Sequence, residues 1–253
     1  MRILIITGIF PPESGGPATY VPRIATELAK IGHQLKVITL SDGFYHDDSA
    51  YPFKVIRIKR ERFKPIRIVE TFIKIVRYGL KSDILFVNGL GVESVLANLF
   101  IRKPLVMRVV GDWGWEKGRN RGLVVDGLDD FQKKRYSLKV EFYRLLQRFF
   151  VNRADAIITP SLYFKSIIAN WGVPENKVEV IYNALEELSL AFPPREILKK
   201  ELRLSGSTVV TVGRLVNWKG VDGIIRAISG IEGVNLVIVG DGPERKKLEK
   251  LTI

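Results

Sequence analysis

The 253-residue sequence predicts an α/β fold in which helices cover both faces of a parallel sheet, followed by a second unit of the same kind. Short apolar runs of strand length recur along the chain, helical periodicity fills most of the intervals between them, and Gly, Pro and Asn mark the junctions. Because the runs are apolar throughout, both faces of each strand should be buried, as in parallel sheets.

The predicted strands of the first unit are these apolar runs. The run at the N-terminus is about four residues long, which is too short for the apolar core of a signal peptide and typical of a strand. No segment reaches the roughly 20 uncharged apolar residues that a membrane-spanning helix needs. In chain order, the predicted strands are Ile3–Ile6, Leu35–Leu40, Ile84–Val87, Leu105–Val110, Ala156–Thr159 and Val178–Tyr182.

The interval after the first strand predicts a helix. Its apolar residues recur at i, i+3, i+4, i+7 and i+8, which places them on one helical face, and Gly32 follows as a suitable C-cap. These apolar residues are Val21, Ile24, Ala25, Leu28 and Ala29.

A second unit repeats the pattern after Pro193-Pro194. We place the domain boundary near 185 to 205, so that the two domains cover 1–190 and 205–253. Two strands and about 50 residues cannot close a sheet covered on both faces, so we expect a complete first domain and a truncated second one. The expected elements are a basic helix at Arg195–Arg203, strands at Thr208–Val212 and Asn235–Val239, and a helix between them at Val221–Ser229.

Composition narrows the classes of partner. With 46% hydrophobic and 26% charged residues the chain should be folded and soluble, and the absence of cysteine excludes disulfides and fits a cytoplasmic location. The net charge of +13 favours anionic partners such as nucleotides, phospholipid head groups or acidic glycans. Nucleic acid is disfavoured because the basic residues are spread over many elements and match no reader motif.

Two strand-to-helix loops carry candidate chemistry. The first, Thr7 to Pro17, lacks the motifs of dinucleotide and phosphate loops, but it brings Gly15-Gly16 to a helix N-terminus, where backbone N–H groups favour a phosphate. The second, Val212 to Gly220, places Arg214 and Lys219 at the carboxyl end of a parallel strand, where both can neutralise a diphosphate. The alternatives are a plain turn for the glycines and solvated surface cations for Arg214 and Lys219.

Together these segments resemble the family-4 glycosyltransferases of the GT-B fold. The resemblance runs from Met1 to Lys250, and the ordered series of segments is far more specific than any one of them. The matching segments are Phe10-Pro-Pro-Glu-Ser-Gly-Gly16, Gly32-His33, Ile157-Ile-Thr-Pro-Ser161, Trp171-Gly-Val-Pro174, Val180-Ile-Tyr-Asn183, Val212-Gly-Arg-Leu215 with Lys219-Gly220, and Val239-Gly-Asp-Gly-Pro243.

The resemblance implies a retaining hexosyltransferase built from two Rossmann-like domains. In that family the N-terminal domain binds the acceptor, here a lipid-linked or glycan acceptor, and the C-terminal domain binds the nucleotide sugar. By this resemblance Gly15 and Gly16 belong to the donor phosphate region, and Arg214 and Lys219 to the diphosphate leaving group. No Asp-x-Asp occurs in the sequence, so we expect no metal and no cofactor besides the nucleotide-sugar substrate.

The sequence departs from the family at two places. Many members have a histidine near the reacting sugar, in a loop that here reads Val109-Val-Gly-Asp-Trp-Gly-Trp-Glu116. We expect Asp112 or Glu116 to contact the acceptor or the transferring sugar, and Trp113 or Trp115 to offer an aromatic face to a sugar ring; a structural use of the loop is the alternative. The family's Glu-x7-Glu donor segment would lie beyond this sequence, so we expect residues 1–253 alone to be inactive.

A basic amphipathic helix is predicted between Phe63 and Lys81. Ile66, Val69, Ile73, Val76 and Leu80 form one helical stripe, and the adjacent stripe is basic, with Arg67, Lys74, Arg77 and Lys81. A second basic helix is expected over Lys133–Arg153. These helices predict peripheral attachment to an anionic membrane surface; the alternative is an ordinary helix whose apolar stripe covers the sheet and whose basic stripe is solvated.

Two other functions fit the sequence. A non-catalytic remnant that binds an acceptor or a membrane is the strongest reading outside the enzymes, because truncation would produce one. A sugar-nucleotide epimerase or a phosphorylase of the same architecture is the alternative within the enzymes, and a new glycosidic bond in the product would distinguish the transferase.

Overall fold

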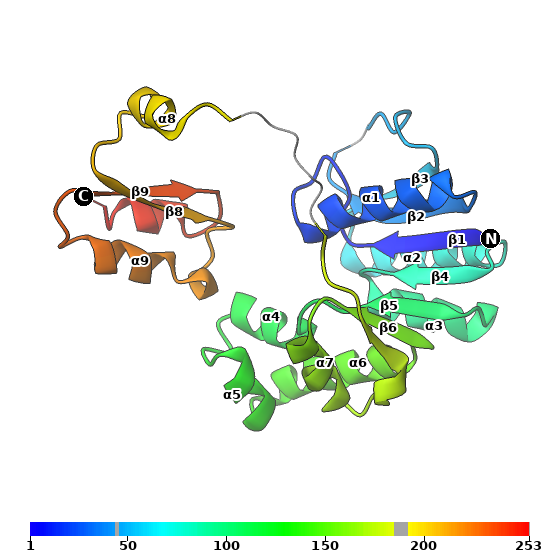
Figure 1. Cartoon of the computed structure of the whole chain (residues 1–253). Coiled ribbons are helices and arrows are strands. Elements are labelled where there is room, and N and C mark those ends of the chain that lie inside the picture. Colours follow the sequence, from blue (N-terminus) through cyan, green and yellow to red (C-terminus); the bar gives the residue numbers. More distant parts are fainter. Residues whose placement is uncertain (44–45, 185–191, 253) are drawn as a thin grey trace. The chain divides into compact units, whose positions relative to one another are not determined.

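The computed structural model describes residues 1–43, 46–184 and 192–252. Its contacts divide the chain into two compact units, Met1–Ala184 and Leu185–Ile253, which Figure 1 colours blue to yellow-green and yellow to red. The first seven residues of the boundary expected near 185 to 205 lie outside the described residues. Each unit is described by itself.

The strands described in unit 1 form one sheet of seven parallel strands in the order β3-β2-β1-β4-β5-β6-β7 (Figure 1). Every strand predicted for this unit is present, within two residues of the expected bounds. The buried apolar runs therefore account for the sheet. The strands are β1 (Arg2–Thr7), β2 (Gln34–Ser41), β3 (Lys54–Lys59), β4 (Ile84–Val87), β5 (Leu105–Arg108), β6 (Ala156–Thr159) and β7 (Val178–Val180).

Strand β3 was not predicted from the sequence. It lies at one edge of the sheet and reads Lys-Val-Ile-Arg-Ile-Lys, so that buried Ile56 and Ile58 alternate with basic residues. An edge strand is covered less completely than a central one, and alternation of apolar and polar residues is its usual pattern. A strand of this kind contains no continuous apolar run that would reveal it in the sequence.

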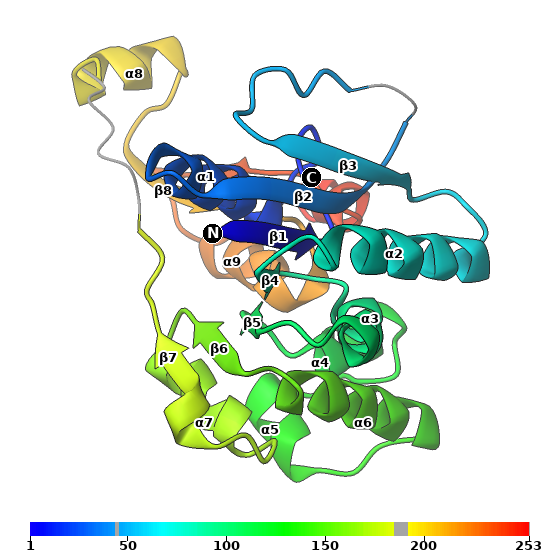
Figure 2. The same ribbon diagram turned by 90° about the vertical axis from the view of Figure 1, so that its right-hand side faces the viewer.

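Helices cover both faces of this sheet. Figure 2 shows α1 and α2 on opposite sides of β1 and β2. Ile3 and Ile5 of β1 pack against α1, whereas Leu4 and Ile6 pack in the core on the other face, beneath α2, α3 and α6. The helices of unit 1 are α1 (Gly16–Lys30), α2 (Lys64–Gly79), α3 (Gly91–Ile101), α4 (Trp113–Asn120), α5 (Leu128–Lys133), α6 (Leu138–Asn152), α7 (Leu162–Ala169) and the 3-10 turn η1 (Glu175–Lys177).

The basic helix expected over Lys133–Arg153 is two helices. Helix α5 ends at Lys133, and α6 begins at Leu138. Lys134 adopts an extended backbone, and the Tyr136 amide donates to the Glu141 carboxylate at 3.0 Å, which replaces a helical bond. The periodicity of charged residues could not reveal this break.

The described residues of unit 2 hold one parallel pair, β8 (Ser207–Val212) and β9 (Val234–Val239), both close to the predicted strands. Its buried core consists of Leu215, Val221, Ile225 and Leu248, and several β8 valines remain exposed. The helices are α8 (Arg195–Glu201), α9 (Val221–Ile228), α10 (Arg245–Glu249) and the 3-10 turn η2 (Asn217–Lys219). Among the described residues of both units, no helix has the length and apolar character required to cross a bilayer.

Candidate functional site

The carboxyl ends of β1 and β4 mark the point where the strand order of unit 1 reverses. From β1 the chain proceeds outward to β2 and β3, and then returns to β4 on the other side of β1. Parallel sheets bind ligands at this switch point. The backbones that follow β1 and β4 lie close together there. A Cβ atom on Gly89 would be only 2.7 Å from the backbone nitrogen of Gly8. The backbone N–H of Asn88 also donates to the Ile6 carbonyl at 2.8 Å.

The loop between β1 and α1 is tied to β2 and β3 by three polar contacts. Glu13 Oε1 accepts from the Asp42 amide at 2.7 Å, Arg57 Nη2 donates to the Pro11 carbonyl at 2.7 Å, and Arg60 Nη2 donates to the Gly8 carbonyl at 3.0 Å. Burial raises the pKa of Glu13, but hydrogen bonding, beginning with the Asp42 amide, outweighs it and leaves that pKa below its ordinary value. The loop is therefore held in place at the switch point.

Gly15 and Gly16 stand at the N-terminus of α1, as predicted. Gly15 has φ +149°, and a Cβ atom there would lie 2.7 Å from Ile9 Cδ1, whereas a Cβ on Gly16 would meet nothing within 4 Å. Gly15 makes no capping side-chain bond, Pro17 follows within the first two helical positions, and none of the described residues in the first turn is acidic. The first turn thus brings no carboxylate to offset the positive end of the helix dipole, which can therefore favour an anion.

A cation that the sequence reading missed lies beside this N-terminus. Arg108 ends β5, and its guanidinium lies 3.8 Å from the centroid of the Tyr20 ring. It donates from Nη1 to Asn88 Oδ1 at 3.2 Å and from Nη2 to Asn183 Oδ1 at 2.8 Å. Burial of the charged group lowers the pKa of Arg108. One signal could have found it, since an arginine ends an otherwise apolar strand at the carboxyl edge of the sheet.

Asp112 is the N-cap of α4. Its Oδ1 accepts from the Trp115 amide at 2.9 Å, its Oδ2 accepts from Gln132 Nε2 at 2.8 Å, and the residue is 4% exposed. Burial raises the pKa of Asp112 despite these hydrogen bonds. Glu116 lies in the first turn of the same helix and is exposed. The structure thus gives Asp112 a helix-capping role and leaves Glu116 accessible to a ligand; catalytic roles for the two stay predictions.

Trp113 and Trp115 both have partners within unit 1. The Trp113 ring lies edge-to-face with Tyr143 and Phe150, at centroid distances of 5.7 and 6.1 Å. Trp115 donates from Nε1 to the Asp126 carbonyl at 3.1 Å and packs on a small apolar cluster beside α4. Each ring is half-buried, so it offers part of its surface at most. Contact of these rings with a sugar stays a prediction.

In unit 2, Arg214 and Lys219 lie on the loop between β8 and α9, as predicted. Both are exposed, and neither side chain has a hydrogen-bond or ion-pair partner in the described part of the chain. Lys219 ends η2, immediately before Gly220, whose φ of +67° leads into α9. Two cations separated by four residues are therefore available to an anion at the carboxyl end of β8.

The Gly-Asp-Gly-Pro segment after β9 holds this loop. The Gly213 amide donates to the Val239 carbonyl at 2.9 Å, and the Leu215 amide donates to the Asp241 carbonyl at 2.9 Å. A Cβ atom on Gly240 would lie 2.0 Å from the carbonyl oxygen of Gly213, and one on Gly242 would lie 2.3 Å from that of Leu215. These glycines permit the close backbone contact that fixes the residues flanking Arg214.

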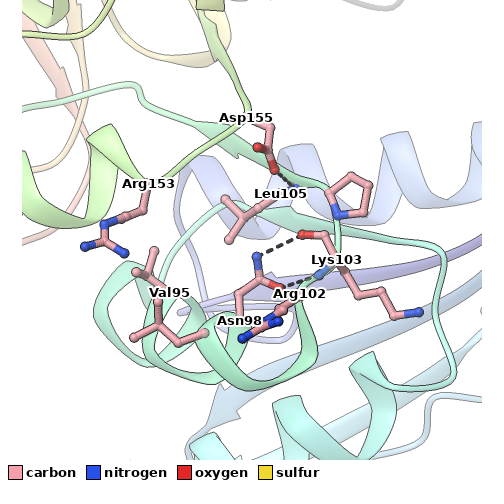
Figure 3. Close-up of a pocket in the computed structure, with 9 residues that line it drawn as sticks. Val95, Asn98, Arg102, Lys103, Leu105, Arg153 and Asp155 are labelled. Atoms are coloured by element: carbon pink, nitrogen blue, oxygen red, sulfur yellow. Dashed lines mark hydrogen bonds between the residues drawn. The ribbon is translucent and has the colours of Figure 1, made fainter.

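A hollow of about 780 Å³ lies at the opposite end of the unit 1 sheet (Figure 3). It adjoins Leu105, the first residue of β5, and Asp155, which accepts the Leu105 amide at 2.8 Å just before β6. Arg102, Lys103 and Arg153 give it a positive rim. Because it lies at the amino ends of the strands, it is separate from the switch point where parallel sheets bind substrates.

Two family models match the sequence in consecutive segments. Residues 14–187 match the model described as Glycosyltransferase Family 4, which covers more than half of the chain. Residues 194–253 match the model described as Glycosyl transferases group 1.

Individual relatives are similar to this chain over different lengths. The lipopolysaccharide core biosynthesis glycosyltransferase LpsD of Rhizobium meliloti is 37% identical over 97 residues, which are 38% of this chain and 26% of that protein. The alpha-monoglucosyldiacylglycerol synthase of Streptococcus pneumoniae is 23% identical over 267 residues, with 99% of this chain and 58% of that protein covered. The chain thus spans less than two thirds of the length of these relatives.

Solved structures share the fold. The crystal structure of Anabaena HepE in complex with UDP and glucose superposes with a TM-score of 0.72 at 20% identity, covering 99% of this chain and 64% of that one. The α/β fold of GT-B type that the sequence predicts is confirmed.

Proposed function

The chain belongs to glycosyltransferase family 4, and from this premise we propose that the protein, continued to the length of its relatives, transfers a hexose from a nucleotide-sugar donor to a lipid-linked or glycan acceptor with retention at the anomeric carbon. The observation that carries the proposal is the loop of Arg214 and Lys219. It presents two cations without protein partners among the described residues, and adjoining backbone contacts hold it in place.

These two cations suit the departing group of the reaction. When the bond between sugar and diphosphate breaks, negative charge develops on the diphosphate while the sugar becomes oxocarbenium-like. Fixed cations directed at that charge lower the barrier because they are oriented before the reaction begins. We assign this role to Arg214 and Lys219 in place of a divalent metal. The N-terminus of α1, with Gly15 and Gly16, is assigned to the donor phosphates on the same electrostatic ground.

The loop after β5 is assigned to the acceptor side. Glu116 is exposed and is the carboxylate we propose to contact the acceptor or the transferring sugar. Asp112 would have an indirect role, because it caps α4 and so holds the first turn, which carries Glu116. Trp113 and Trp115 would offer a sugar only the parts of their rings that remain exposed.

We also propose peripheral attachment to an anionic membrane through the apolar face of α2 and α3. Most of the predicted stripe does not cover the sheet. Ile66, Val69, Ile73 and Leu80 are each more than half exposed, as is Phe63 at the N-cap of α2, whereas Val76 packs against the core. The face continues onto α3, where exposed Phe100 lies edge-to-face with Phe72 of α2 at 5.6 Å. Exposed apolar residues of this extent commonly mark an interaction surface.

Only part of the predicted basic stripe is available to a membrane surface. Arg67 donates to the Arg60 carbonyl and Lys74 pairs with Glu70, so both are engaged within the unit. Arg77 and Lys81 remain exposed at the rim. The hollow described above adjoins this face, because exposed Leu99 of α3 also lines the hollow. The basic residues at the rim of the hollow therefore add to the positive charge near the apolar face. Each basic residue near an anionic surface is worth about 1 kcal/mol, decaying within a Debye length.

Vesicle binding tests this attachment. The chain should sediment with vesicles containing anionic lipid but not with neutral vesicles, and salt should weaken the binding. Ile73→Ser should reduce binding several-fold. Ile31→Ser removes an equally apolar, exposed side chain at the end of α1 and should leave binding unchanged. Equal binding to neutral and anionic vesicles would refute the attachment.

Transfer itself is tested with a panel of nucleotide sugars and acceptor lipids or glycans. Residues 1–253 should be compared with a version extended to the length of the relatives. We expect a new glycosidic bond from the extended protein and none from residues 1–253, because the part of the second unit that the structure describes offers one pair of strands to hold a donor. Equal rates for the two proteins would contradict this expectation, and donor isomerisation without transfer would point to an epimerase.

A further inference from the structure

The surroundings of Arg108 lie next to the N-terminus of α1. Tyr20, whose ring stacks on the guanidinium, comes four residues after Gly16 at the start of that helix. Four residues span about 6 Å along a helix axis. The positive end of the helix and the Arg108 cation therefore reinforce one another at the carboxyl edge of the sheet.

The charge of Arg108 is not neutralised by its contacts. Its partners are two neutral amide oxygens, on Asn88 and Asn183, and the π face of Tyr20. Among the described residues no carboxylate lies within ion-pairing distance of it. Charged groups that are partly removed from water are normally paired, so this cation is unusual.

Asn88 provides a second, independent sign of a missing acceptor. The residue is 8% exposed, and its Nδ2 atom is buried without a hydrogen-bond partner among the described residues. Buried donors in native proteins are almost always satisfied, and an exception commonly indicates a water or an ion at the site. An anion at Arg108 would bring acceptor oxygens within reach of the buried Asn88 Nδ2.

We propose that Arg108 binds a phosphoryl group of the acceptor, with Asn88 and Asn183 positioning its guanidinium. The proposal rests on the proposed transferase function. The donor diphosphate already has Arg214, Lys219 and the N-terminus of α1 assigned to it, whereas Arg108 ends β5, whose following loop is assigned to the acceptor. An arginine suits this task because its planar group can donate two parallel bonds to phosphate oxygens.

Methyl phosphate is the probe, and calorimetric titration in chloride buffer is the measurement. The protein is the whole chain carrying Arg214→Ala and Lys219→Ala, so that the donor cations cannot bind the probe. In this background Arg108→Gln should weaken methyl phosphate binding roughly tenfold to a hundredfold, because a charge-assisted bond is lost. Arg108→Lys keeps the charge but not the planar group, so its affinity should lie between those of wild type and Arg108→Gln. Arg135→Gln removes an exposed arginine elsewhere and should change nothing.

Asn88→Asp tests whether binding needs an unpaired charge on Arg108 or only a guanidinium held in this position. The new carboxylate would stand where the amide oxygen now lies, 3.2 Å from Nη1, and would form an ion pair that keeps the guanidinium in place. Binding of methyl phosphate should fall as far as in Arg108→Gln, although the arginine is still present. Circular dichroism checks that each variant retains the fold.

A second titration, with UDP and intact Arg214 and Lys219, identifies the source of the phosphate. We expect Arg108→Gln to leave the UDP affinity within about twofold of wild type. An equal loss of UDP affinity would assign the phosphate to the donor and overturn the proposal. Unchanged methyl phosphate binding in Arg108→Gln, or no saturable binding before that substitution, would overturn it too. Neither titration measures transfer, so failure of the proposed function is detected separately.

Discussion

Gly240→Ala should release the loop that carries Arg214. A Cβ atom there would lie 2.0 Å from the Gly213 carbonyl oxygen, and real Cβ atoms essentially never approach another atom within 3.0 Å. The two backbones must therefore separate by about 1 Å (3.0 − 2.0), which breaks the 2.9 Å bond from the Gly213 amide to the Val239 carbonyl. Alanine at φ +148° costs roughly 1 to 3 kcal/mol, and overpacking costs about as much again.

Unit 2 has little capacity to absorb this cost. Among its described residues the buried apolar cluster has four members, and one of them, Leu215, lies on the affected loop. We expect hydrogen exchange of the whole chain, read peptide by peptide, to accelerate across β8 and β9 while unit 1 is unaffected, and UDP binding to weaken. Gly230→Ala is the control, since a Cβ there meets nothing within 4 Å. Wild-type exchange and UDP affinity in Gly240→Ala would refute the reasoning.

Three further predictions concern unit 1. Asp112→Ala should destabilise the protein by roughly 0.5 to 2 kcal/mol in chemical unfolding through loss of the α4 cap, whereas Asp112→Asn should retain most of that stability; a large loss of transfer in Asp112→Asn at unchanged stability would instead establish a catalytic carboxylate. Gly15→Ala should lower the thermal midpoint more than Gly16→Ala, because only Gly15 combines a positive φ with a Cβ contact of 2.7 Å; equal midpoints would contradict this. Arg2 lowers the pKa of Asp83 to about 2, chiefly by side-chain hydrogen bonding, so this contact contributes stability above the ordinary aspartate pKa and loses it as the pH falls through about 2. Carboxyl NMR titration of Arg2→Gln should show the Asp83 pKa returning toward its ordinary value, and an unchanged pKa would remove Arg2 as the cause.

Local signals predicted most of the fold. Strands β4 and β6 lie at the predicted residues because their apolar runs are bounded by polar or turn-forming residues. Helix α2 was also predicted, but the direction of its apolar stripe was not. Ile75 and Gly79 face the core, while Ile66 and Ile73 of the predicted stripe are exposed. A helix with two apolar faces cannot be oriented from periodicity alone.

The candidate site was predictable only where neighbours in sequence form it. Gly15 and Gly16 could be placed because a helix N-terminus follows from local pattern. The surroundings of Arg108 could not, because they require the ends of β4 and β5, a residue after β7 and one turn of α1 to converge. Likewise the sequence shows that Asp112 precedes a helix, but not that Gln132 would occupy its second oxygen.

The central claim is that Arg214 and Lys219 stabilise the leaving diphosphate, and steady-state kinetics of the extended protein test it most directly. Each charge-assisted bond to phosphate is worth roughly 1.5 to 3 kcal/mol, so Arg214→Ala or Lys219→Ala should lower kcat/KM by tens-fold to hundreds-fold. EDTA should have little effect on the wild-type rate. Unchanged kinetics in both variants, or complete loss of wild-type activity on chelation, would contradict the account.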